Sequence, residues 1–147
     1  MVKRIFKTKI IYYINIAFNI IYFLLVVDEL KFLLDGKLPS EDSKYKILMT
    51  MIYVLYFLIY SFNLIILFSK FKKSIFYLNF SFILLIFINI ADYFFHYYSS
   101  NFVENRELLI VALSIIILIV LTLIFFNNKY KFVLDYKEME QIGQKEL

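Results

Sequence analysis

Cysteine is absent from this 147-residue chain, and glycine, proline and tryptophan are scarce or absent. The sequence contains two glycines, one proline and no tryptophan. Without cysteine, the chain has no disulfide, no thiolate metal ligand and no thiol redox chemistry. The glycines and the proline all lie outside the long apolar runs. This excludes GxxxG helix pairing, and it argues against the broken helices that transporters use at their sites.

Charge is also missing from four long stretches of the chain. The uncharged runs are Ile10–Val27, Ile47–Ser69, Ser74–Ala91 and Leu108–Asn128. A helix needs about 20 apolar residues to cross a hydrocarbon core of roughly 30 Å. Each run therefore predicts one membrane crossing, with spans near 10–27, 47–69, 74–94 and 108–127. We expect a single transmembrane domain over residues 1–128 and a short cytoplasmic tail over 129–147.

The basic residues that flank these runs predict the orientation. Eleven of the 16 Lys and Arg lie before residue 10, between 70 and 73, or after 128, and five lie in the other two connections. The positive-inside rule therefore places both termini in the cytoplasm. Because short connections make consecutive helices antiparallel, we predict an all-α membrane protein. Its fold is an antiparallel up-down-up-down four-transmembrane-helix bundle.

Two local signals refine the first span. No small-x-small cleavage pattern follows Val27, so this helix is expected to be retained rather than removed as a signal peptide. No helix breaker occurs before Gly36, which predicts that the helix continues about two turns beyond the membrane.

The abundance of Ile, Phe, Lys and Tyr is typical of A+T-rich codons. This composition favours a bacterial cytoplasmic (inner) membrane as the location of this multi-pass protein.

Polar side chains recur within the apolar runs at helical spacing. Polar groups in hydrocarbon usually face protein or water rather than lipid. The predicted intramembrane polar layer consists of Asn15, Asn19, Tyr56, Tyr60, Asn63, Asn79 and Thr122. Asn15, Asn63, Asn79 and Thr122 lie roughly one and a half turns from the cytoplasmic ends of their runs. Three interpretations remain open: hydrogen bonds that tie the helices together, the lining of a polar cavity or pore, or a pattern that arises only from the codon bias.

A second polar group is predicted at the outer rim of the bundle. It comprises Asp28, Glu29, Asn89, Asp92 and His96. A histidine beside carboxylates has the chemistry for a divalent metal or for proton transfer. The alternative, a solvated rim at the helix ends, is favoured here because one histidine with scattered carboxylates defines no reaction. We therefore predict no catalytic residue, no metal and no cofactor.

The tail carries a short apolar stripe. Phe132, Tyr136 and Met139 follow the spacing i, i+4, i+7, which places them on one face of a helix. This face is expected either to lie along the membrane surface or to contact a cytoplasmic partner. A frayed tail with no such role is the alternative.

The function is inferred from the features that the apolar runs lack. The four uncharged runs contain no acid, thiol, helix break or nucleotide motif, and every acid lies at or beyond the end of a run. The leading hypothesis is a non-catalytic membrane protein that acts through protein–protein contacts in or beside the lipid bilayer. The alternative is an oligomeric pore or channel-forming effector. In size and layout the chain is similar to small immunity proteins against membrane-active toxins, and to membrane effectors of bacterial defence operons. The expected partner is another membrane protein or a second copy, and not nucleic acid.

Overall fold

The computed structural model describes residues 5–35, 43–69, 73–99 and 106–131. Its helices are α1 (Lys9–Leu34), α2 (Ser43–Ser69), α3 (Ser74–Ser99) and α4 (Arg106–Lys129). All four are long and apolar enough to cross a membrane, which indicates a multi-pass membrane protein. The predicted tail stripe of Phe132, Tyr136 and Met139 lies outside the described residues.

The first helix extends beyond its predicted span. It continues for about two turns past Val27, as expected from the absence of a breaker, and ends at Leu34. The Asp35 backbone N–H then donates to the Lys31 carbonyl oxygen at 2.9 Å. Lys31 in the last turn places a positive charge beside the negative end of the helix dipole.

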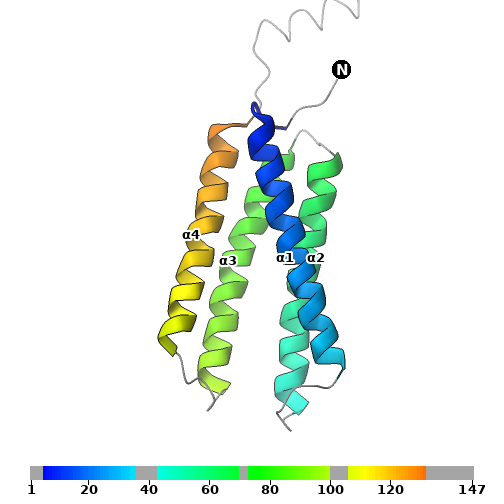
Figure 1. The fold of residues 1–147 in the computed structure, drawn as a ribbon, viewed down its shortest axis with the longest axis vertical. Coiled ribbons are helices and arrows are strands. Elements are labelled where there is room, and N and C mark those ends of the chain that lie inside the picture. Colours follow the sequence, from blue (N-terminus) through cyan, green and yellow to red (C-terminus); the bar gives the residue numbers. More distant parts are fainter. Residues whose placement is uncertain (1–4, 36–42, 70–72, 100–105, 132–147) are drawn as a thin grey trace, which may run out of the picture.

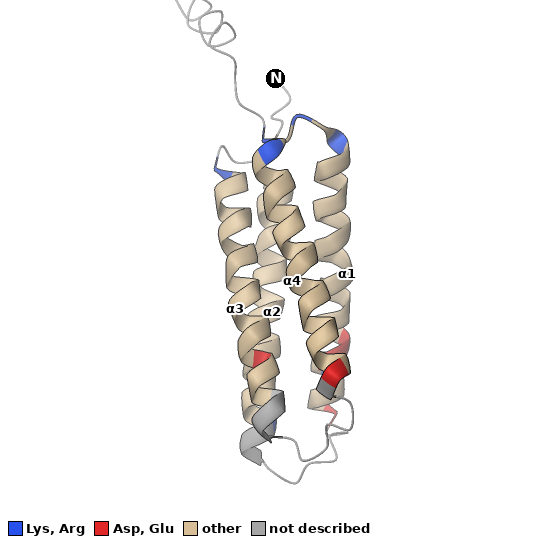
Figure 2. Ribbon diagram, turned by 90° about the vertical axis from the view of Figure 1, so that its left-hand side faces the viewer, with Lys and Arg blue, Asp and Glu red and all other residues tan. Residues whose placement is uncertain are grey.

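Consecutive helices pack side by side, whereas α1 and α4 share only a few contacts (Figure 1). Most of the described lysines lie at one end of the bundle and the described acids lie towards the other, where Lys31 and Lys46 also lie (Figure 2). We call one end the lysine-rich end; its described lysines are Lys7, Lys9, Lys73, Lys129 and Lys131. The described acids lie towards the opposite end and are Asp28, Glu29, Asp35, Asp92 and Glu107.

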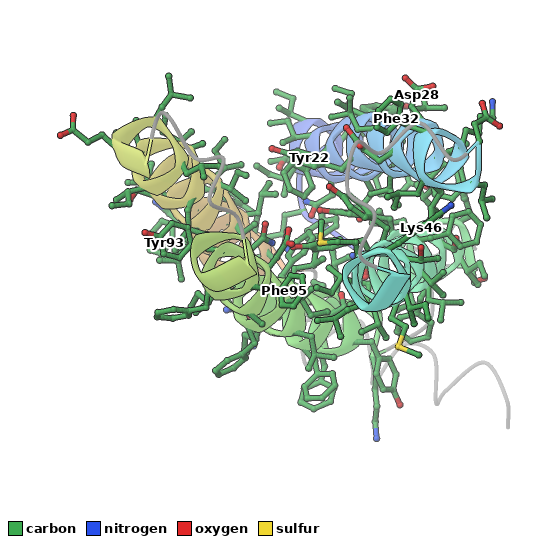
Figure 3. All side chains as sticks on the ribbon, turned by 90° about the horizontal axis from the view of Figure 1, so that it is seen from below. Tyr22, Asp28, Phe32, Lys46, Tyr93 and Phe95 are labelled. Atoms are coloured by element: carbon green, nitrogen blue, oxygen red, sulfur yellow. The ribbon has the colours of Figure 1, made fainter. Side chains whose placement is uncertain are left out.

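The core is concentrated near the lysine-rich end. On α3 the buried residues end at Leu85, and on α4 they begin at Val120. The described side chains of α3 beyond Leu85, and those of α4 before Val120, are all exposed or half-buried. Figures 1 and 3 show the α3/α4 pair standing apart from the α1/α2 pair at the opposite end. The two helical hairpins are therefore joined mainly at one end.

The segment before α1 packs into that joined end. Phe6 and Lys131 form an isolated antiparallel bridge, and the Lys7 backbone N–H donates to the Tyr130 carbonyl oxygen at 2.8 Å. Ile5 and Phe6 are both buried within the main hydrophobic core. The bridge therefore ties the start of the described chain to the end of α4.

Candidate functional site

Asparagines occupy the centre of the joined core. Asn15 and Asn19 on α1 and Asn63 on α2 are 0% exposed. Asparagine is a weak helix former because its side chain competes for backbone hydrogen bonds. In α1 the two side chains instead bond to the helix that contains them. The Asn15 and Asn19 amides donate to the carbonyl oxygens of Ile11 and Asn15, one turn earlier, each at 2.8 Å.

One set of amides links three helices. Asn15 Nδ2 on α1 donates to Asn127 Oδ1 on α4 at 2.8 Å. Asn127 Nδ2 in turn donates to Asn79 Oδ1 on α3 at 3.1 Å. Asn79 Nδ2 then donates to Asn128 Oδ1 at 2.9 Å. Each amide N–H in this set donates to the amide oxygen of the next asparagine. All three bonds therefore run in the same direction, from Asn15 on α1 to the exposed Asn128 on α4.

A second set brings in α2. Asn63 Nδ2 donates to Asn19 Oδ1 at 2.9 Å, and the Ser81 hydroxyl on α3 donates to Asn63 Oδ1. The two sets meet at α1, because the Asn19 amide bonds to the Asn15 backbone. We call the combined group the amide layer: Asn15, Asn19, Asn63, Asn79, Ser81, Asn127 and Asn128. It connects all four helices.

The amide layer differs from the predicted polar layer on α4. Thr122 was expected to take part, but it is exposed, and its hydroxyl donates to the Leu118 carbonyl oxygen at 2.7 Å within its own helix. Asn127 fills that place instead and is 0% exposed. Asn127 shares one helix face with Val120 and Leu123, but α4 is apolar on all sides, so its sequence does not mark that face as buried. Ser81 and Asn128 were also missed.

The two predicted tyrosines belong to an aromatic column rather than to the amide layer. Tyr60 stacks on Tyr22 of α1, with ring centroids 5.7 Å apart, and on Tyr56, with centroids 6.4 Å apart. Both Tyr56 and Tyr60 are buried. Tyr56 also interacts electrostatically with the half-buried Asp92 of α3.

The predicted outer rim does not come together as a metal site. Asp28 and Glu29 are exposed, and Asn89 donates to the Leu85 carbonyl oxygen of its own helix at 2.7 Å. The side chain of His96 lies outside the described residues. Among the residues that the structure describes, no group of three or more His, Cys, Asp or Glu is placed to hold a metal ion.

The chemistry of the amide layer is hydrogen bonding between neutral groups. Its only hydroxyl, that of Ser81, is engaged by Asn63 and by the Leu78 carbonyl oxygen. Asn15 Oδ1 is the one amide oxygen of the layer that accepts no hydrogen bond from a described residue.

Comparison with protein-family models, with curated proteins and with solved structures finds no match to this chain.

Replacing Asn63 with leucine tests the amide layer directly. We expect the free energy of unfolding to fall by roughly 0.5–2 kcal/mol, the range for hydrogen bonds between membrane helices. The matched control is Asn89→Leu, because the Asn89 amide bonds only to its own helix in the described structure. Unfolding by SDS titration in mixed micelles measures both variants. Equal losses would show that Asn63 does not tie helices together.

Proposed function

We propose that this protein crosses a bacterial cytoplasmic membrane as an antiparallel up-down-up-down bundle and acts by binding another membrane protein. Both termini lie in the cytoplasm in this proposal. The lysine-rich end supports that orientation, because positive charge accumulates on the cytoplasmic side of membrane proteins. A toxin-immunity protein or an accessory subunit fits this description. In this proposal the protein acts by binding alone and catalyses no reaction.

The observation that carries the proposal is the separation of the two hairpins. The buried residues Val120, Leu123 and Asn127 define the inner face of α4. Leu109, Leu113 and Ile116 continue that face at alternating spacings of three and four residues, yet they are only half-buried. The inner face therefore continues beyond the point where α1 departs from α4. A transmembrane helix of a partner would complete its packing.

Large apolar side chains would make this contact. The face lacks glycine, so the partner helix would pack by interlocking side chains rather than by close backbone approach. Because lipid tails are as apolar as leucine, such association depends on fitted van der Waals packing. The contact should therefore be sensitive to the shape of individual residues on α4.

A photoreactive amino acid at position 113 tests the proposal. In the native membrane, we expect position 113 to give an adduct of one constant mass with another membrane protein. Position 118 is the matched control, because Leu118 lies on the same helix but is 67% exposed. Retention of that partner in mild detergent should fall with Leu113→Ala and persist with Leu118→Ala. Equal adducts at both positions, or none at either, would contradict the proposal.

The burial of the polar residues does not favour the pore alternative. Asn15, Asn19 and Asn63 face the interior of one chain, where Leu67 and Phe82, both 0% exposed, fill the core. An oligomeric pore lined by these amides would first require the bundle to open.

We therefore expect purified protein in planar bilayers to give no channel current, even at a high protein-to-lipid ratio. A water-filled path needs a continuous polar lining, and the closed core offers none at the level of Phe82. Discrete single-channel currents that disappear with Asn63→Leu would contradict this expectation and support a pore.

A further inference from the structure

Three lysines from the two ends of the described chain lie at the lysine-rich end. The Phe6–Lys131 bridge and the hydrogen bond from the Lys7 N–H to the Tyr130 carbonyl oxygen place Lys7 beside the end of α4. Lys129 is the last residue of that helix. Lys7, Lys129 and Lys131 are all exposed. Backbone pairing, rather than proximity in sequence, therefore brings Lys7 to the other two.

Aromatic rings position the Lys129 ammonium group. Its Nζ lies 5.7 Å from the centre of the Phe125 ring and 5.6 Å from that of Tyr130. Both distances lie within the range of a cation–π interaction. The Tyr130 ring in turn packs against Phe126, with centroids 6.0 Å apart. The ammonium group therefore lies beside Tyr130, and tyrosine is a residue type that is enriched at membrane interfaces.

No described acid offsets this charge. The described acids, Asp28, Glu29, Asp35, Asp92 and Glu107, lie towards the opposite end. The first turn of α1 begins at Lys9, contains no acidic residue and has no side-chain cap from Thr8. The positive end of the α1 dipole therefore adds to the field of the lysines.

We propose that Lys7, Lys129 and Lys131 form a binding site for the headgroup of an anionic phospholipid. The lysines contact the phosphate-bearing headgroup, and Tyr130 lies at the boundary between headgroup and acyl chains. The neighbouring surface favours a lipid over a soluble phosphate. Ile10, Tyr13 and Phe125 are 69%, 62% and 59% exposed and offer apolar area for an acyl chain. The site does not depend on the proposed function.

Binding of phosphatidylglycerol to the purified protein tests this site. Native mass spectrometry from micelles with added phosphatidylglycerol or phosphatidylcholine should show preferential retention of the anionic lipid. Each lysine near a headgroup is expected to contribute roughly fivefold in affinity. The triple variant Lys7→Gln, Lys129→Gln, Lys131→Gln should therefore bind phosphatidylglycerol roughly a hundredfold more weakly, the product of three such effects. The charge-matched control is Lys31→Gln, Lys44→Gln, Lys46→Gln.

The outcomes separate the site from a general charge effect. Unchanged binding by the triple variant, or an equal loss in the control, would overturn the proposal. So would full competition by inorganic phosphate at the concentration of the lipid, because it would indicate a site for a soluble anion. If the triple variant does not fold, Lys131→Gln alone should still weaken binding roughly fivefold. Unchanged binding by that single variant would also overturn the proposal.

Discussion

Replacing Phe82 with alanine should lower the free energy of unfolding by about 3 kcal/mol. The Phe82 side chain is 0% exposed, and its ring meets that of Phe18 edge to face, with centroids 5.8 Å apart. Leu78 and Leu85, also 0% exposed, lie one turn away on the same helix face. Because lipid is as apolar as the core, the loss comes from van der Waals contacts that the cavity removes.

The matched control for this prediction is Phe87→Ala. Phe87 lies on the same helix but is 65% exposed, so its ring contacts lipid in the proposed membrane arrangement. We expect a change within about 0.5 kcal/mol, as for surface positions generally. SDS titration in mixed micelles, followed by far-UV circular dichroism, measures both variants. A loss for Phe87→Ala as large as that for Phe82→Ala would show that the assigned core is wrong.

The helices could be predicted from the sequence because an uncharged apolar stretch of about 20 residues is typical of a membrane span. The extension of α1 to Leu34 was also predictable, since the chain contains no helix breaker before Gly36. The separation of the two hairpins could not be predicted from the sequence. Leu113 and Leu118 are chemically identical, and apolar residues that face lipid resemble those that face protein. Hydrophobicity therefore cannot indicate where α1 departs from α4.

Chemical differences between asparagine and threonine explain the error at Thr122. A threonine hydroxyl has one donor, and the Leu118 carbonyl oxygen of its own helix satisfies it. An asparagine amide has two N–H donors and a carbonyl acceptor, so one backbone contact leaves bonding capacity unused. Asn15 uses one donor on Ile11 and the other on Asn127. Buried asparagines therefore predict contacts between helices better than threonines do.

The omission of Asn127 has a geometric cause. Counting depth from the ends of the runs assumes that the helices end at the same level. Asn127 lies two residues before the end of α4, whereas Asn15 lies six residues after the start of α1. Their hydrogen bond shows that the two helices are offset along their axes. This offset depends on packing and has no local signal in the sequence.

Asn127 should therefore be a sensitive position of the amide layer, comparable with Asn63, which also makes two interhelical bonds. Its side chain accepts from Asn15 and donates to Asn79, so it joins α1 and α3 through α4. Asn127→Leu removes both bonds and leaves a buried Asn15 donor unpaired. We expect the free energy of unfolding to fall by about 2 kcal/mol, from two interhelical bonds and the unpaired group.

Two comparisons distinguish this effect from a general response to leucine. Asn128→Leu should have a smaller effect, because Asn128 is exposed and accepts a single bond from Asn79. In a double-mutant cycle, Asn15→Leu and Asn127→Leu should be coupled by roughly 0.6 kcal/mol, the average for hydrogen bonds between membrane helices. Additive losses at these two positions would mean that their amides do not interact. The offset of α4 relative to α1 would then lose its main support.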